Sequence, residues 1–430
     1  MERALRMVIS IFVFAVLAQY LGPEQFGIFN FAVAFVALFT PVLALGLNRP
    51  VVRQLIEERL EAQTLMLSVF VIRLAAAFIM IILVLVGIYF QSTTELAANL
   101  IIIIALGFLF QPFDVIALWY ESQIRSRFTV FAKFAAFGLA SSVKLILIAQ
   151  DAPLVWFAWS NVLELALGAA FICWFYFAQT RDFSSARLRP NKVLNMLRKS
   201  WPAIPAALGI SACMRLDQIM LEYLVDFRAV GVYAAGSRLS EAWFFLTGAV
   251  VTSAFPILIH HRSDDRKEYR ENLGRLMLLV YCVALVIVIP TILAGEWIVH
   301  FLYGTEYQQS AEILKIHIVS LIPMAFGQAS GLWIYAEWKI MLDLYRALLG
   351  VSVNVALNLM LIPIYGPSGA AVATVVSLIA AFYLFDMLVP SMRQLFLQKS
   401  RALLLVGLPS ELKFQMIRLG RLLNASSGKR

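Results

Sequence analysis

Long apolar runs recur along the chain and are separated by short polar connections. There are twelve such runs. A bilayer core about 30 Å thick needs about 20 apolar residues in a helix, whereas the strands of a membrane barrel would alternate over about ten residues. The runs are continuously apolar and therefore predict membrane-spanning helices. They cover approximately residues 7–20, 28–47, 64–90, 98–119, 128–149, 153–177, 201–224, 230–259, 273–294, 311–335, 341–363 and 367–389.

Composition supports the same class of protein. Of the 430 residues, 61% are hydrophobic and 14% charged, against about 25% charged residues in an average soluble domain. This low proportion of charged residues excludes a soluble enzyme. Although the net charge is +9, the protein is not expected to bind nucleic acid. No ATP-binding loop, metal-ligand spacing or cofactor motif is found. The three cysteines lie in apolar runs and predict no disulfide; they are Cys173, Cys213 and Cys282.

Basic residues mark alternate connections between the runs. The N-terminus, the even-numbered connections and the C-terminal tail together hold 28 of the 35 lysines and arginines, and the odd-numbered connections hold only Arg228. Because cytoplasmic loops are enriched in lysine and arginine, both termini are predicted to be cytoplasmic.

The longest polar stretch, 179–200, divides six runs from six. It predicts a first lobe at 1–180, a cytoplasmic loop at 181–200, a second lobe at 201–390 and a basic cytoplasmic tail at 391–430. The turns YLGPEQFGIF (20–29) and YLVDFRAVGVY (223–233) match after one inserted residue. Two similar halves are typical of transporters whose site lies between them.

Six cations fall within the runs, with Arg275 and Arg346, near the starts of their runs, counted among the connections. An arginine or lysine at the bilayer centre costs about 2.5–3.5 kcal/mol, so these side chains must line water, pair with acids or extend to the interface. The last possibility applies to Lys133, Lys144 and Lys315, which lie near run ends. Arg73 has no acid within a turn of its own helix and is therefore the leading candidate for contacting an anionic ligand.

The seventh and eighth runs carry further polar residues. Ser211, Arg215, Gln218 and Glu222 form one stripe at helical spacing, with Asp217 directed elsewhere. Arg238 and Glu241 are three residues apart and can pair with each other or meet a ligand. The acids in the runs can relay protons or act as counter-ions, and the counter-ion role is favoured for Asp217 and Glu241. The acids considered for these two roles are Asp114, Glu164, Asp217, Glu241 and Asp386.

Several motifs, in this order and spacing, resemble the O-antigen and polysaccharide flippases of the multidrug/oligosaccharidyl-lipid/polysaccharide exporter superfamily. The resemblance covers most of the first 390 residues. The motifs are YLGPEQFG (20–27), LGLNR (45–49), FQPFDVI (110–116), MRLDQIM (214–220), GVYAA (231–235) with RLSE (238–241), and YGPSGAA (365–371).

This resemblance implies an all-α polytopic membrane protein with about 12 transmembrane helices in two six-helix lobes, as in the related MATE transporters. It implies a flippase, not an enzyme, that moves undecaprenyl-pyrophosphate-linked oligosaccharide to the periplasmic leaflet by alternating access. Its implied partners are the bilayer, a polysaccharide polymerase and chain-length machinery. The alternatives are a multidrug or cation antiporter of the same superfamily and a flippase for the peptidoglycan lipid precursor.

The predicted site combines the residue pattern with this resemblance. A pyrophosphate that crosses a membrane needs positive charge in a water-filled cavity. We expect four cations to line the cavity between the lobes and to attract the pyrophosphate or acidic sugars, and three acids to serve ion coupling or as counter-ions. The cations are Arg73, Lys144, Arg215 and Arg238, and the acids are Asp114, Asp217 and Glu241.

Both ends of the chain depart from the family pattern. The first run holds about 14 residues, so its helix either begins in the interface or lacks a preceding stretch. In the tail, 403–423 mixes aliphatic with basic residues, as in an interfacial helix, although Pro409 interrupts it and a disordered tail is the alternative.

Overall fold

The computed structural model describes residues 2–58, 61–91, 93–179, 187–264, 266–337 and 339–406, without the side chains of 2–4 and 255–266. Its regular structure is helical within these ranges. The first half contains α1 (Glu2–Ala44), α2 (Asn48–Glu57), α3 (Ala62–Gln91), α4 (Glu95–Gly107), η2 (Phe108–Asp114), α5 (Val115–Ser122), α6 (Arg127–Ala149) and α7 (Leu154–Gln179). The second half contains α8 (Pro190–Ser200), α9 (Ala203–Leu224), α10 (Phe227–Glu241), α11 (Phe244–Asp264), α12 (Arg266–Tyr303), η3 (Thr305–Tyr307), α13 (Gln309–His317), η4 (Ile318–Ser320), α14 (Leu321–Ala336), α15 (Met341–Ile379), η5 (Ala380–Leu384), α16 (Phe385–Leu388), η6 (Pro390–Met392) and α17 (Arg393–Leu403).

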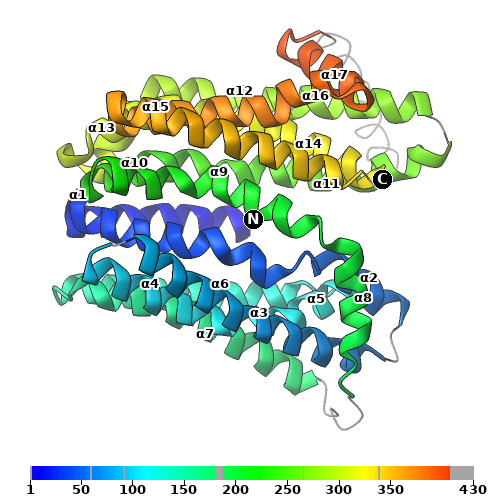
Figure 1. Cartoon of the computed structure of the whole chain (residues 1–430), viewed down its shortest axis with the longest axis horizontal. Helices are drawn as coiled ribbons and strands as arrows, with labels where there is room; N and C mark the ends of the chain where they lie inside the picture. The colour runs from blue at the N-terminus through cyan, green and yellow to red at the C-terminus, as the bar shows by residue number, and fades with distance from the viewer. Residues whose placement is uncertain are drawn as a thin grey trace, which may run out of the picture.

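The predicted spans are all helical. Among the described residues, nine helical segments are long and apolar enough to cross a membrane. Two of these segments hold two predicted spans each, because the chain reverses inside them at Gly22 (φ 68°) and Gly366 (φ 58°), as Figure 1 shows for α1. Glycine adopts this left-handed conformation at no steric cost. The eighth predicted span consists of α10 and α11. The first run is helical from Glu2, so that helix is longer than the apolar pattern indicated.

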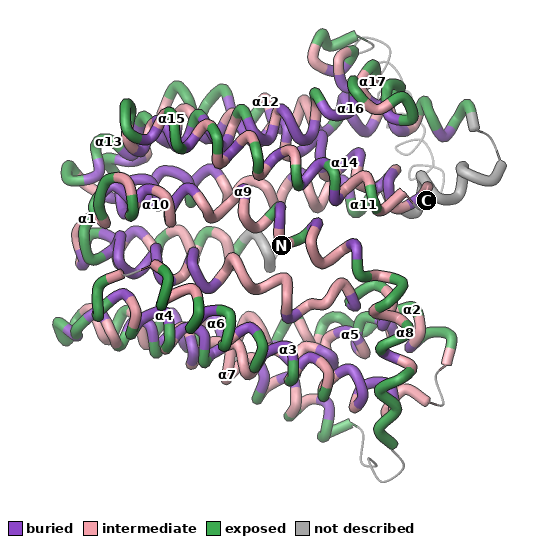
Figure 2. The backbone as a smooth tube through the Cα atoms, viewed as in Figure 1, coloured by how far each residue is buried: buried purple, intermediate pink, exposed green. Residues whose placement is uncertain are grey.

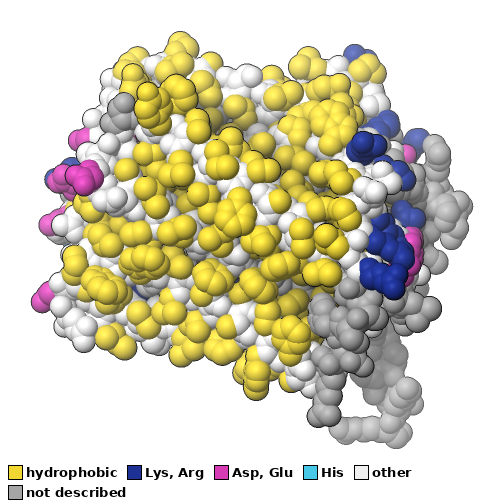
Figure 3. Space-filling model, turned by 60° about the horizontal axis from the view of Figure 1, so that its bottom comes forward, with side chains coloured by type: hydrophobic (Ala, Val, Ile, Leu, Met, Phe, Trp, Pro, Cys, Tyr) yellow, Lys and Arg dark blue, Asp and Glu magenta, His cyan; other side chains and the backbone are white. Residues whose placement is uncertain are grey.

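Charged side chains gather at the two ends of the molecule, with a hydrophobic band between them (Figure 3). We call the end that carries α2, α8 and α17 the basic end, because lysines and arginines crowd its visible face. The turns at Gly22 and Gly366 lie at the opposite end. This segregation agrees with the alternation of basic connections, and the assignment of the basic end to the cytoplasm stays a prediction.

The buried apolar core is shared by the two lobes only at the opposite end. The largest cluster combines residues of α1, α3, α4 and α7 with residues of α9, α10, α12, α13 and α15. Toward the basic end, one cluster lies within α2, α3 and α5–α8, and another within α11, α12, α14, α16 and α17. The helices of the two lobes also diverge in this direction (Figure 1), and buried positions are dense along α10 (Figure 2). The apolar cores of the lobes are therefore joined at the opposite end and separate at the basic end, where Arg49 of α2 still lies 4.0 Å from the ring centre of Tyr335 of α14.

Two glycines make this joint possible. Gly27 of α1 and Gly231 of α10, which the internal repeat aligns, lie against each other. A Cβ atom on Gly27 would stand 1.7 Å from the carbonyl oxygen of Phe227, and one on Gly231 would stand 1.9 Å from that of Pro23. The backbones can approach this closely only because neither residue has a side chain.

Hydrogen bonds between the lobes close the same end. The Tyr307 hydroxyl donates to the carbonyl oxygen of Ala18 at 2.8 Å, and the Gln19 amide donates to that of Leu302 at 2.8 Å. The first bond is buried, where such a bond is not weakened by competing water.

The segment between the lobes, which contains α8, forms ion pairs with the first lobe at the basic end. Lys192 of α8 pairs with Glu58 and, at 3.0 Å, with Glu61, which also pairs with Arg189 at 2.9 Å. The Lys192 hydrogen bond, together with the positive charge of Arg189, lowers the pKa of Glu61. The predicted loop at 181–200 thus contains an anchored helix.

The predicted basic tail begins as a helix packed on the second lobe. Lys399 of α17 is fully buried and donates to Asp386 at 2.8 Å, to Ser330 at 3.0 Å and to the Phe382 carbonyl at 2.6 Å. Arg346 binds the other carboxylate oxygen of Asp386 at 2.5 Å. Both cations are thus buried within the second lobe, because α17 folds back onto α14 and α16. Most of the predicted interfacial helix at 403–423 lies outside the described residues.

Alanine at Gly27 or Gly231 should force the lobes apart at the opposite end. Overpacking of this kind costs about 1–3 kcal/mol, and each 1.4 kcal/mol shifts an equilibrium about tenfold. In a background without the native cysteines, we expect Ala235→Cys, which is buried one turn beyond Gly231, to react with a membrane-impermeant maleimide in intact cells only when either alanine is present.

The matched control is Gly138→Ala, where an added Cβ meets nothing within 4 Å. Labelling that stays absent in all three variants would contradict the role of the glycine contact. Labelling in inverted vesicles but not in cells would instead place this end in the cytoplasm.

Asp386→Asn should destabilise the second lobe by about 3–5 kcal/mol, because it leaves buried Lys399 without its counter-charge and Arg346 with only Asp343 at 3.8 Å. The measurement is thermal unfolding of the purified protein in detergent. Glu296→Gln, which removes an exposed partner of Lys315, is the control and should cost at most about 1 kcal/mol. Equal stability of the two variants would show that the buried triad contributes no more than a surface pair.

Candidate functional site

Charged side chains from both lobes gather around the middle of the predicted spans. Arg6 of α1 donates to Glu164 of α7 at 3.0 Å, and Arg215 of α9 pairs with Glu241 of α10 at 3.2 Å. The two pairs belong to different lobes, and the charge of Arg238 interacts with both acids. We call this group the inter-lobe charge cluster; it consists of Arg6, Lys144, Glu164, Arg215, Arg238 and Glu241.

Lys144 lacks an ion pair among the described residues but donates to Asn161, and Arg238 has neither an ion pair nor a side-chain hydrogen bond there. Its side chain is exposed, yet its guanidinium lies 5.3 Å from the ring centre of Phe14 in the first lobe and interacts with the charge of Arg215 in the second. Because Arg238 has neighbours in both lobes, its exposed side chain faces the space between the lobes rather than lipid. Of the two possibilities left open for Arg238, pairing with Glu241 is not found, because Arg215 reaches Glu241 from the neighbouring helix.

The cluster holds more positive than negative charge. Four cations, Arg6, Lys144, Arg215 and Arg238, accompany two acids, so the formal charge is about +2 when all are ionised. Lys144 is attracted by Glu164 and repelled by Arg238, which connects α6 to the same group. Lys144 and the other two lysines near span ends all have polar partners: Lys133 with Asp114 at 2.9 Å, Lys144 with Asn161 at 2.9 Å, and Lys315 with Glu296 at 2.5 Å.

The polar stripe of α9 faces the first lobe. The Ser211 hydroxyl donates to the Ala37 carbonyl of α1 at 3.0 Å, and Glu222 accepts a hydrogen bond from Gln91 of α3 at 2.9 Å. Arg215, between them on the stripe, projects into the inter-lobe charge cluster. The stripe therefore runs along the boundary between the lobes.

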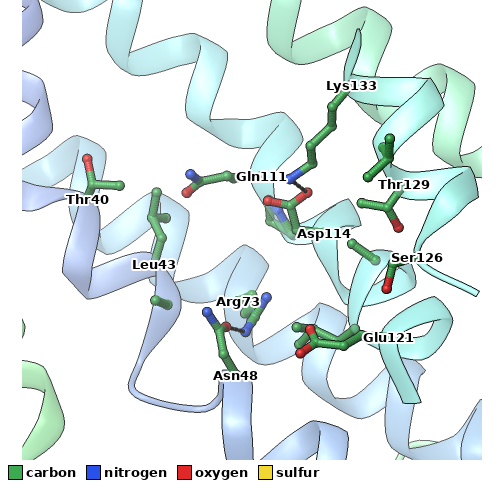
Figure 4. Close-up of a pocket in the computed structure, with 15 residues that line it drawn as sticks. Thr40, Leu43, Asn48, Arg73, Gln111, Asp114, Glu121, Ser126, Thr129 and Lys133 are labelled. Carbon is green, nitrogen blue, oxygen red and sulfur yellow. Dashed lines mark hydrogen bonds and ion pairs between the residues drawn. The ribbon is translucent and has the colours of Figure 1, made fainter. Parts of the chain in front are cut away.

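Arg73 lies apart from the other three predicted cavity cations. It is 5% exposed and donates to Asn48 at 2.6 Å, while its Nε has no partner. Figure 4 shows it beside a cavity of about 430 Å³ within the first lobe, near the ion pair of Asp114 and Lys133. We call this cavity the lobe-one pocket. It is lined by Thr40, Leu43, Ala44, Asn48, Arg73, Gln111, Pro112, Asp114, Ala117, Leu118, Glu121, Ser126, Thr129, Val130 and Lys133.

Asp217 is buried in the second lobe among neutral hydrogen-bond donors. Asn354 and Asn358 donate to Oδ1 at 3.0 and 2.6 Å. Tyr233 donates to Oδ2 at 2.6 Å, and the hydroxyl of Thr374 also donates to Oδ2. No described cation pairs with it, so the favoured counter-ion role is wrong for Asp217, whereas Glu241 does pair with a cation. Asn354, Asn358 and Thr374 were not among the predicted site residues. Two asparagines one turn apart in an apolar span are nevertheless a signal for a polar site.

Comparison with known families agrees with this fold. A family model described as "Polysaccharide biosynthesis protein" matches residues 3–262, which is more than half of the chain. The chain therefore belongs to this family of multi-pass membrane transporters, as the motifs indicated. A second family model, "Lipid II flippase MurJ", matches residues 245–408.

Individual relatives are more distant. "Probable flippase AglR" of Haloferax volcanii is 28% identical over 169 residues, and the match spans 38% of this chain and 35% of that relative. Among solved structures, the lipid II flippase MurJ in an inward closed conformation is similar with a TM-score of 0.72 at 13% identity, over 94% of this chain and 90% of that chain. An inward-facing MATE multidrug transporter is similar with a TM-score of 0.64 at 14% identity, over 90% and 96%. The predicted MATE-like fold is thereby confirmed.

Proposed function

We propose that this protein is a flippase that carries a lipid-linked oligosaccharide from the cytoplasmic to the periplasmic leaflet of a bacterial inner membrane by alternating access. The proposed cargo is an undecaprenyl-pyrophosphate-linked repeat unit of O-antigen or another surface polysaccharide. The observation that carries the proposal is the inter-lobe charge cluster, which places an excess of positive charge between two transporter lobes.

The physical argument concerns the pyrophosphate. An anion in the middle of a membrane needs compensating charge, and guanidinium groups bind phosphate oxygens through directed hydrogen bonds. Arg238, without an ion pair of its own, is available for this. The prenyl chain stays in the surrounding lipid, where it is already soluble.

The arrangement of apolar cores supports an inward-facing starting state. The basic end, where the cores are separate, would face the cytoplasm and admit the head group, and both termini would then be cytoplasmic. Outward opening would divide the shared core at Gly27 and Gly231. The polymerase and chain-length proteins implied by the family resemblance stay a prediction.

Arg238→Ala should abolish most transport without loss of folded protein, because it removes a cation that forms no ion pair with a described acid. We expect a strain that depends on the variant to accumulate sugar-loaded undecaprenyl lipid on the cytoplasmic leaflet, with flipping reduced at least tenfold, or about 1.4 kcal/mol. Extracted lipids are identified by mass spectrometry, and leaflet is assigned by accessibility of the sugar to an impermeant oxidant.

Two further variants separate ligand binding from structure. Lys315→Ala removes a span cation that pairs with exposed Glu296 and should transport normally. Arg215→Glu combined with Glu241→Arg keeps the pair and the net charge. Recovery of transport in this double variant would assign Arg215 a structural role.

The same experiment decides between the proposal and its alternatives. Accumulation of the peptidoglycan precursor would favour the function named by the second family model, which matches residues 245–408. Altered drug sensitivity without lipid accumulation would favour an antiporter, for which a cavity with excess positive charge is poorly suited. Full activity of Arg238→Ala would refute the proposed role of the cluster.

Ion coupling is proposed at Asp217 rather than at Asp114 or Glu241. The latter two have permanent counter-ions in Lys133 and Arg215, so a change in their ionisation would break an ion pair. Asp217 has only neutral donors, and a carboxylate buried without a counter-charge is costly. Uptake of a proton or another cation would relieve that cost and change the charge of the second lobe.

Asp217→Asn mimics the neutral form and should make transport indifferent to the coupling gradient. In proteoliposomes, we expect wild-type flipping of a fluorescent lipid-linked sugar to respond to an imposed pH gradient, and the variant to keep only a slow, gradient-independent rate. Glu222→Gln, an acid on the same helix with a neutral partner, is the control and should respond as wild type. A wild-type response to sodium instead of pH would identify the ion differently, and a response preserved in Asp217→Asn would exclude Asp217.

A further inference from the structure

The lobe-one pocket differs from the inter-lobe charge cluster in its charge balance. The pocket contains two cations, Arg73 and Lys133, and two acids, Asp114 and Glu121, so its formal charge is about zero when all are ionised. The cluster has a formal charge of about +2. A pyrophosphate is attracted to the cluster, whereas the pocket suits a polar ligand without net charge.

The pocket offers both hydrogen-bond donors and acceptors. Asn48, Gln111 and Thr129 add neutral groups to its charged residues, and a sugar hydroxyl both donates and accepts. The Nε atom of Arg73 and the Oγ1 atom of Thr129 are buried without a hydrogen-bond partner. A buried polar atom that lacks a partner costs about 1–3 kcal/mol, and a bound hydroxylated ligand would supply partners. The volume of about 430 Å³ is within the range of small-molecule sites.

One helix face connects the pocket with the cluster. Lys133 lines the pocket, and Lys144 belongs to the cluster; they are eleven residues apart on α6. Eleven residues bring both side chains to nearly the same face, roughly 16 Å apart along the helix axis. The pocket lies nearer the start of α6, on the side of α2 and α5 and hence toward the basic end (Figure 4).

We propose that the lobe-one pocket binds uncharged sugar units of the transported lipid while the inter-lobe charge cluster holds its pyrophosphate. This inference rests on the proposed function and adds a second subsite to it. A lipid-linked oligosaccharide joins an anionic group covalently to a neutral, hydroxyl-rich chain, so a single molecule satisfies both sites. Arg73 then donates to sugar oxygens, in line with its position outside the cluster.

The experiment measures binding of two lipids to the full-length protein in nanodiscs. One probe is undecaprenyl pyrophosphate, and the other is the same lipid carrying one N-acetylglucosamine. We expect wild type to bind the sugar-bearing lipid more tightly. Arg73→Gln should raise its Kd about tenfold and Thr129→Val a few-fold, and neither should change the Kd of the sugar-free lipid. Arg238→Ala should weaken both lipids by the same factor.

Controls keep the result interpretable. Ser142→Ala removes an exposed hydroxyl from α6 that bonds only the Gly138 carbonyl, and it should bind both lipids as wild type does. Thr129→Val is nearly isosteric, so it tests the pocket even where Arg73→Gln unfolds, and gel filtration identifies unfolded variants.

Each other outcome overturns the inference in a distinct way. Equal wild-type affinity for the two lipids would refute the sugar subsite and leave the flippase function intact. Equal weakening of both lipids by Arg73→Gln would make the pocket part of the anion site. Failure of wild type to bind either lipid would refute the proposed function itself, and the subsite with it.

Discussion

A charged group inside a membrane span must meet an opposite charge, a set of hydrogen bonds or water, and the protein satisfies this constraint in three ways. In the second lobe, two buried cations, Arg346 and Lys399, pair with Asp386, and Arg346 also lies 3.8 Å from Asp343. Asp217 is surrounded by neutral donors. The inter-lobe charge cluster instead leaves positive charge uncompensated. The first arrangement stabilises a lobe, whereas the other two remain electrically incomplete, as groups that meet a transported molecule or ion must be.

The spans and their grouping could be predicted because membrane insertion depends on properties local to each segment. Length and hydropathy identify a helix without knowledge of its neighbours, and the reversals at Gly22 and Gly366 follow turn signals in the sequence. The repeat also aligned Gly27 with Gly231, which the structure places in contact. The repeat predicted equivalent positions for these two glycines in the two lobes. It did not predict that the two glycines would be in contact.

Partners within the site could not be predicted, because they depend on how helices rotate and pack. Arg238 and Glu241 share a helix face, yet Arg215 from α9 takes the acid. Arg73 was grouped with the inter-lobe cations because it lies within a span and has no acid within a turn of its own helix, whereas the structure places it beside a pocket in the first lobe. Lys399 was treated as a tail residue, since position in the sequence does not reveal that α17 folds back to bury it.

The geometry of α10 connects the proposed ion site with the joint between the lobes. Tyr233 donates to Asp217 and also belongs to the apolar core shared by both lobes. It lies only two residues beyond Gly231, whose contact with α1 holds the opposite end closed.

Neutralising Asp217 would weaken its hydrogen bond with Tyr233, because a hydrogen bond to a charged acceptor is stronger than one to a neutral acceptor. Tyr233 would then be held less firmly within the shared core. A change in the charge of Asp217 would thus act directly on α10, the helix that must move for outward opening. The inter-lobe charge cluster is not needed for this effect. Ion binding and substrate binding can then bias the same two-state joint from separate sites, which is the physical requirement for coupled transport.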